Sequence, residues 1–120
     1  MNEALSLIDA VMQKTVIATQ STPPSDPNPG DTYRVASGAL EWVGQDDALA
    51  IFFGGSWHFL TPANGSMIFD QSAAHFLHFS NSWVAASTPT SPQGGSNIDT
   101  EARAAIDQVI QSLQIVGLYV

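Results

Sequence analysis

The three histidines are the residues of this sequence best suited to metal binding or proton transfer. His75 and His78 are three apart, so on a helix they would share a face and could bind one metal ion. The apolar residues around them favour a strand, however, and on a strand the two side chains point to opposite faces. His58 has no partner that the sequence identifies. Because cysteine is absent as well, we expect no metal site.

Carboxylates and hydroxyls form no recognisable catalytic pattern either. Asp46 and Asp47 are adjacent, whereas a glycosidase needs two carboxylates that face one bond across about 5–9 Å. Neighbouring residues in a turn diverge, so a solvated turn is expected here. No serine lies in a Gly-x-Ser-x-Gly segment, and no glycine-rich phosphate loop follows a predicted strand. We therefore expect no catalytic residues, no cofactor and no enzymatic activity.

Three tryptophans, Trp42, Trp57 and Trp83, are the remaining candidates for a binding site. Aromatic rings on a β surface can stack on the apolar face of a sugar, which predicts a glycan-binding surface. The alternative is that they pack in the core, because tryptophan has a high mean burial and large apolar residues surround each one. For a domain of this size we favour the core.

The charge balance limits the classes of partner. Three basic and eleven acidic residues give a net charge of −8, which leaves too few cations for a nucleic-acid or anionic membrane surface. Charged residues make up only 12% of the chain, about half the usual share of a soluble domain. Such a weakly charged surface is typical of a protein partly covered by other chains.

Residues 32–86 carry the signals of a β domain. Gly54-Gly55 separates two apolar segments and predicts a two-residue hairpin in which Phe52 faces Trp57. Ser80-Asn81 predicts a second hairpin, and residues 51–57 resemble residues 77–83 closely enough to indicate an internal repeat. The predicted strands are residues 32–36, 40–43, 48–53, 56–60, 67–70, 75–79 and 82–86.

Two amphipathic segments flank the β region. The first runs from residue 3 to about 18, with Asn2 as its cap and Leu5, Ile8 and Met12 on one face. The second runs from about 100 to 116, between a cap at Asp99 and a glycine at 117. The fold class is therefore α+β, a small antiparallel β domain of about six or seven short strands in hairpins with a helix at each end. We divide the chain into a helix plus β domain (1–86), a flexible linker (87–98) and a C-terminal helix and tail (99–120).

The last helix carries a heptad pattern. Its apolar residues have the spacing of a coiled-coil seam, which predicts a homo-oligomer, with a trimer favoured and a dimer or pentamer left open. The same face could instead fold back on its own β domain. The seam begins at Ala102, and its predicted contact residues are Ile106, Val109, Ile110, Leu113 and Val116.

An ordered set of residues spans about residues 2–85 of the chain. It comprises Asn2-Glu3-Ala4-Leu5, Pro23-Pro24, Pro29-Gly30-Asp31, Tyr33, Val35, Trp42, Gly44, Ile51, Gly55, Trp57, Phe59, Pro62, Gly65, Phe79 and Trp83-Val84. This set resembles an uncharacterised domain family of phage tail-fibre and gene-transfer-agent head-spike proteins.

This resemblance implies a structural protein of a phage or phage-like virion. The expected role is a subunit of a head spike or tail fibre, made in the host cytoplasm and located in the virion, where it acts in particle assembly and host attachment. Other virion proteins are then expected partners, and host surface polysaccharide is a further one. The alternative function is a carbohydrate-binding module that recognises a host surface glycan.

Overall fold

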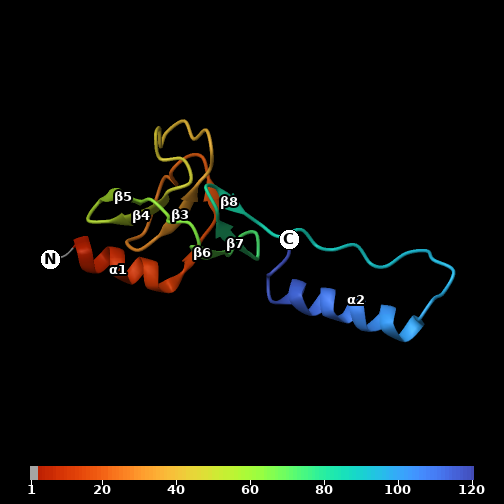
Figure 1. Cartoon of the computed structure of the whole chain (residues 1–120). Helices are drawn as coiled ribbons and strands as arrows, with labels where there is room; N and C mark the ends of the chain where they lie inside the picture. The colour runs from red at the N-terminus through yellow and green to blue at the C-terminus, as the bar shows by residue number, and fades with distance from the viewer. Residues whose placement is uncertain (1–2) are drawn as a thin grey trace.

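A computed structural model describes residues 3–120 (Figure 1). Helix α1 (Glu3–Gln13) leads into a β domain, and helix α2 (Thr100–Ile115) lies near the C-terminus. The strands are β1 (Thr15–Val16), β2 (Thr19–Gln20), β3 (Thr32–Val35), β4 (Leu49–Phe53), β5 (Ser56–Leu60), β6 (Met67–Asp70), β7 (His75–Phe79) and β8 (Trp83–Val84). The α+β class predicted from the sequence is confirmed.

The eight strands form two four-stranded sheets with the same plan. One sheet has the order β1-β6-β7-β8 and the other β2-β3-β4-β5. In each, a two-residue strand pairs in parallel with the first strand of a three-stranded antiparallel meander. Strands β4 and β7, which contain the start of the predicted sequence repeat, occupy the same position in their sheets. The internal repeat predicted from the sequence is therefore matched by a repeat in the strand topology of the two sheets.

One stretch of backbone, residues 14–20, forms the parallel edge of both sheets. The carbonyls of Lys14 and Val16 accept hydrogen bonds from the β6 side, at 2.8 and 2.9 Å. The carbonyls of Ala18 and Gln20 accept from the β3 side, at 3.0 and 2.8 Å. The chain thus passes from one sheet to the other between β1 and β2, and its backbone groups are satisfied on both sides.

Two apolar clusters form the core. Tyr33, Val35 and Ala50 on one face of the β2–β5 sheet pack against Trp42, which lies in the loop between β3 and β4. Val16, Ile68, Leu77 and Trp83 form the second cluster, and Leu49 packs against it. The β2–β5 sheet is therefore covered on one face by its own loop, while its other face contributes Leu49 to the core of the second sheet.

Polar contacts join the two sheets as well. The buried carboxylate of Asp70 accepts hydrogen bonds from the Thr19 hydroxyl at 2.8 Å and from the Ala73 amide at 3.0 Å. Arg34 is half-buried, and burial lowers the pKa of its guanidinium, an effect that the negative charges of Asp47 and Asp70 oppose. Its Nε atom is buried and has no hydrogen-bond partner among the residues described.

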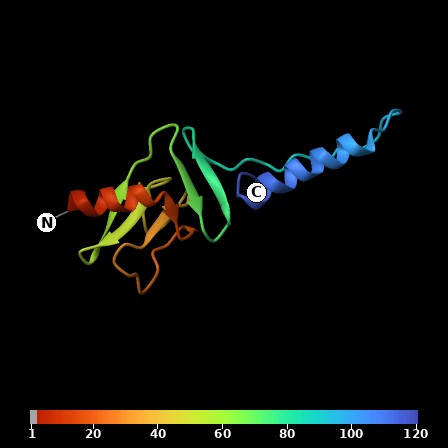
Figure 2. The same cartoon turned by 90° about the horizontal axis from the view of Figure 1, so that it is seen from below.

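Beyond β8 the chain forms a projecting arm, residues 87–120, here called the C-terminal arm. Residues 87–98 lead away from the β domain and α2 runs back towards it (Figures 1 and 2). The Asp99 side chain caps α2 by accepting from the Ala102 amide at 2.9 Å, as predicted. Gly117, with φ +81°, ends it in a Schellman motif whose hydrogen bonds are Leu118 to Leu113 and Gly117 to Gln114. The molecule measures 64 × 27 × 27 Å.

Several sequence predictions need correction. Residues 3–120 form eight strands instead of six or seven, and two of their six pairings are parallel. Helix α1 ends at Gln13 instead of about residue 18, because Thr15 and Val16 pair with β6. No strand forms over residues 40–43, where the chain bends to bury Trp42. The predicted cap Asn2 lies outside the described residues.

The second hairpin also differs from its prediction. Phe79 pairs with Trp83, so its loop contains three residues instead of two, with Asn81 at φ 62°. The first hairpin is confirmed, because Phe53 pairs with Ser56 and Phe52 with Trp57 across Gly54-Gly55. The apolar face predicted for α1 is exposed at Leu5, Ile8 and Met12.

Replacing Asp70 tests the polar link between the sheets. Asp70→Ala leaves the Thr19 hydroxyl and the Ala73 amide without their acceptor, so the free energy of unfolding should fall by about 2–4 kcal/mol. Urea denaturation measures the change. Asp26→Ala, in an exposed loop, is the matched control and should alter it by less than about 0.5 kcal/mol. An equally small effect at Asp70 would contradict the proposed link.

Candidate functional site

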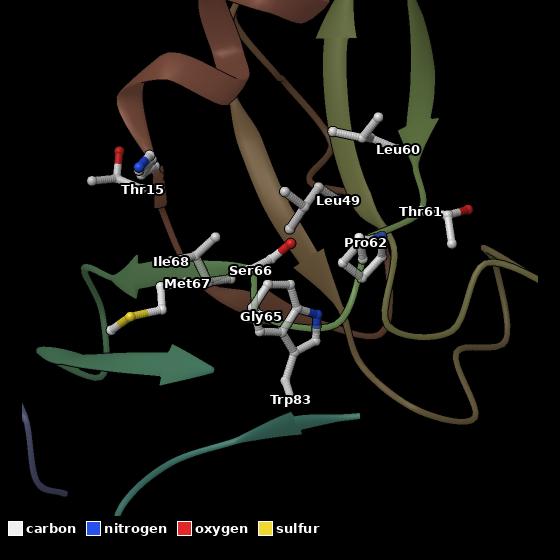
Figure 3. Close-up of a pocket in the computed structure, with 12 residues that line it drawn as sticks. Thr15, Leu49, Leu60, Thr61, Pro62, Gly65, Ser66, Met67, Ile68 and Trp83 are labelled. Carbon is white, nitrogen blue, oxygen red and sulfur yellow. The ribbon is translucent and has the colours of Figure 1, made fainter. Parts of the chain in front are cut away.

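A cavity of about 470 Å³ opens between the two sheets beside the end of α1 (Figure 3). Its lining comes from both sheets and from the loop between β5 and β6. The lining residues are Lys14, Thr15, Leu49, Leu60, Thr61, Pro62, Ala63, Gly65, Ser66, Met67, Ile68 and Trp83. Its volume falls within the range of about 300–1,000 Å³ that is usual for small-molecule sites.

The chemistry of this cavity is mixed. Leu49, Ile68 and Trp83 provide apolar surface, and the indole of Trp83 is held in place because its Nε1 donates to the Asp47 carbonyl at 2.8 Å. Thr15, Thr61 and Ser66 add hydroxyls. Lys14, one of the three basic residues of the chain, adds a cation. Apolar surface with a few polar groups is the usual composition of a small-molecule site.

The three tryptophans do not gather on one surface. Trp42 and Trp57 meet edge to face, with ring centroids 5.3 Å apart, in the cluster on the β2–β5 sheet. Trp83 belongs to the other cluster. Trp42 and Trp83 are only 5% and 8% exposed, so both contribute to the core. Of the three, only Trp83 lines the cavity between the sheets.

The C-terminal arm exposes most of the predicted seam. No residue of α2 is buried. Ile106, Val109 and Val116 are 46%, 58% and 56% exposed, whereas Ile110 and Leu113 are half-buried. A hollow of about 380 Å³ lies between Pro89 and Thr90 of the linker and Ala105, Ile106, Val109 and Ile110 of α2. The seam is thus divided between a part shielded within the arm and a larger part open to solvent.

The base of the arm is attached to the β domain by a few backbone contacts. The Phe76 amide of β7 donates to the Gly117 carbonyl at 2.7 Å, and the Val120 amide donates to the Ala86 carbonyl at 2.9 Å. A Cβ on Gly117 would lie 2.8 Å from Phe69 Cε2, so only glycine fits. At the far end, the Arg103 guanidinium donates to the Gly94 carbonyl and links α2 to the linker.

The histidines are arranged differently from one another. His75 and His78 lie on β7 and point to opposite faces, as predicted. His58, for which the sequence identified no partner, has three neighbours. Its Nδ1 lies 3.1 Å from Glu3 Oε1, its Nε2 lies 3.2 Å from Ser56 Oγ, and its ring stacks on Phe53. These neighbours come from α1 and from the β4–β5 hairpin.

Asp46 and Asp47 occupy a turn, as predicted. The Asp46 carboxylate accepts from the Gly38 amide at 3.0 Å, and Asp47 has a φ of 65°. Within residues 3–120, no three histidine or acidic side chains come together as metal ligands. In the same part of the chain, neither helix has the length and apolar character needed to cross a bilayer.

The fold defines a class of small α+β domain in which a paired-sheet unit is followed by a helical arm. The chain belongs to an uncharacterised domain family, described as "Protein of unknown function (DUF2793)", whose family model matches residues 1–84. The match ends at β8, so the C-terminal arm lies outside it. No curated protein matches the chain.

Gly117→Ala should detach the base of the arm, because the new Cβ meets Phe69 and the positive φ is strained. The Phe76 amide would lose its acceptor and should exchange its hydrogen at least about tenfold faster, a change equivalent to about 1.4 kcal/mol. Amide exchange followed by NMR measures this. Gly95→Ala shares the positive φ without a backbone clash and should leave Phe76 unchanged. Equal exchange rates in both variants would contradict this account of the attachment.

Proposed function

We propose that the chain is a structural subunit of a phage or phage-like particle, in a head spike or tail fibre, and that it assembles as a homo-oligomer through α2. The observation that carries the proposal is the exposed apolar seam of a helix that has no buried residue. Helix α2 has 16 residues, close to the length of about 12–15 residues below which isolated helices are marginal in water even for favourable sequences. Another copy of the chain supplies the missing apolar contacts.

The dimensions of the single chain support an assembled state. Its radius of gyration is 18.5 Å, against about 13.5 Å expected for a compact domain of this length. The excess comes from the C-terminal arm, which projects from the β domain (Figure 2). An extended arm that buries little of its own surface gains stability when several arms pack together. A trimer is the favoured number, with a dimer and a pentamer as the other outcomes.

The virion assignment rests on the resemblance to tail-fibre and head-spike domains. The low share of charged residues agrees with a surface partly covered by other virion proteins. A spike or fibre also benefits from several copies of a weak binding site, because avidity multiplies their strength in host attachment.

Substituting the exposed part of the seam tests the assembly. Ile106→Asp combined with Val109→Asp removes two apolar contacts per subunit, about 3 kcal/mol, which weakens association by roughly a hundredfold. Light scattering after size-exclusion chromatography should give an oligomer for the wild type and a single chain for the variant.

Val43→Asp is the matched control for this experiment, since Val43 is 78% exposed on a loop of the β domain. It should assemble like the wild type. A wild type that is monomeric at micromolar concentration, or a double variant that assembles normally, would show that α2 is no interface.

A second candidate function is glycan recognition, favoured by the cavity between the sheets. Trp83 supplies a flat apolar surface there, the hydroxyls of Thr15, Thr61 and Ser66 suit sugar hydroxyls, and Lys14 suits an acidic substituent. The proposed glycan site is therefore this cavity and not a surface formed by all three tryptophans, because Trp42 and Trp83 are core residues. Host surface polysaccharide is the proposed ligand.

Filling the cavity tests glycan recognition without removing a core tryptophan. Ser66→Leu places a larger side chain in the cavity and should abolish any glycan-array signal of the wild type, a loss of at least about tenfold in affinity. Ser82→Leu, on the exposed loop between β7 and β8, should bind as before. Absence of binding by the wild type, or equal binding by both variants, would exclude the cavity as a glycan site.

A further inference from the structure

Three polar side chains, one from the N-terminal helix and two from the middle of the sequence, meet on one face of the β4–β5 hairpin. Ser56 and His58 are two residues apart on β5, so they share a face of the strand. Glu3 approaches this face from the first turn of α1. Ser56 Oγ lies 3.2 Å from His58 Nε2, and His58 Nδ1 lies 3.1 Å from Glu3 Oε1. We infer that Ser56 is a nucleophile activated by His58 and Glu3, and that this cluster hydrolyses small, unhindered esters.

The order of atoms in the cluster is the one that nucleophile activation requires. A carboxylate can only accept, so the contact with Glu3 places a hydrogen on His58 Nδ1. In the neutral imidazole Nε2 then carries the lone pair and accepts the hydroxyl hydrogen of Ser56. The contacts run from a hydroxyl to an imidazole and from the imidazole to a carboxylate. This is the general arrangement of a nucleophile, a base and a group that orients the base.

The imidazole is held in this orientation by Phe53. The two rings are stacked with centroids 3.7 Å apart and planes 8° from parallel. Phe53 pairs with Ser56 across the hairpin, so the stacking partner and the nucleophile are fixed by the same strand register. The side chain of His58 is 23% exposed, which leaves an edge accessible to a reacting group.

The turn that precedes Ser56 provides hydrogen-bond donors. Gly54 and Gly55 have φ values of 60° and 78°, and within the described chain neither amide donates to another backbone carbonyl. Free backbone amides beside a nucleophile can stabilise an oxyanion. Ser56 is exposed on the hairpin and lines neither the cavity between the sheets nor the hollow in the C-terminal arm. A short acyl group on an accessible ester therefore suits the site best.

The reaction proceeds in two balanced steps. In the first, Ser56 Oγ bonds to the ester carbon while its proton moves to His58 Nε2, and the C–O bond breaks as that proton passes to the leaving alcohol. In the second, a water molecule gives its proton to Nε2 and bonds to the acyl carbon. The bond to Oγ then breaks and Ser56 recovers the proton, so an acid and an alcohol are released.

The internal repeat provides a matched control within the same molecule. Ser82 occupies the same place as Ser56 in the sequence repeat, and both residues precede a tryptophan, although Ser82 is the last residue of its hairpin loop and Ser56 the first residue of β5. Two residues further on, the first unit has His58 and the second has Val84. Ser82 is therefore an exposed serine in a similar setting that lacks the base.

Covalent labelling of the full chain with a fluorophosphonate probe tests the inference. Mass spectrometry of the digested protein should find the label on Ser56, at a rate at least a hundredfold above that of Ser82. His58→Ala should reduce labelling of Ser56 by about 10²–10⁴-fold, the usual contribution of a general base. Glu3→Gln should reduce the labelling rate of Ser56 by a smaller factor and alter the pH profile of labelling. Ser56→Ala should abolish the acyl intermediate that forms from p-nitrophenyl acetate.

A contact that only holds α1 against the hairpin would give a different result. Ser56 would then react no faster than Ser82 in the wild type, and this comparison needs no variant to fold. Labelling of Ser56 that is unchanged in a folded His58→Ala variant would equally overturn the inference.

Discussion

The two sheets of this domain depend on one short stretch of backbone, residues 14–20, that pairs with both. Its carbonyls are divided between the two sheets, since those of Lys14 and Val16 accept from the β6 side and those of Ala18 and Gln20 accept from the β3 side. Because buried backbone groups must be paired, neither sheet can move away without breaking this ladder. The hydrogen bond from Thr19 to Asp70 joins the sheets beside the same stretch.

This shared edge explains where the cavity lies. Residues 14 and 15 sit at the point where α1 ends and β1 begins, and both line the cavity between the sheets. The sheets meet along this edge and in part of a core, and the cavity lies where the loop between β5 and β6 spans them (Figure 3). The α1 helix, fixed by the same edge, brings Glu3 to His58 on the β4–β5 hairpin.

The sequence predicted the local parts of the fold well and the long-range parts poorly. Strands β5, β6 and β7 have their predicted bounds, because alternating apolar residues and turn residues are local signals. Two-residue strands such as β1 and β2 contain no period to detect, so the parallel pairs were missed. Residues 40–43 were predicted as a strand because most of them are apolar. In the structure they form a loop, and Trp42 packs from this loop against the sheet.

The same distinction applies to the candidate sites. The seam of α2 and the caps at Asp99 and Gly117 follow from spacing along one helix, and the structure shows that much of the seam is exposed. The cavity and the contact between His58 and Glu3 join distant parts of the sequence, which no local pattern reveals. The alternation of Ser56 and His58 on one strand was visible, and it was the available signal for that cluster.

The central claim is that contacts between copies of the chain, more than contacts within one copy, stabilise α2. Hydrogen exchange of the α2 amides, measured over a series of protein concentrations, tests this claim most directly. The account predicts strong protection at high concentration and exchange close to that of an unfolded peptide after dilution well below the dissociation constant, with the amides of β4 and β7 protected throughout. Protection of α2 that does not change with concentration would contradict it.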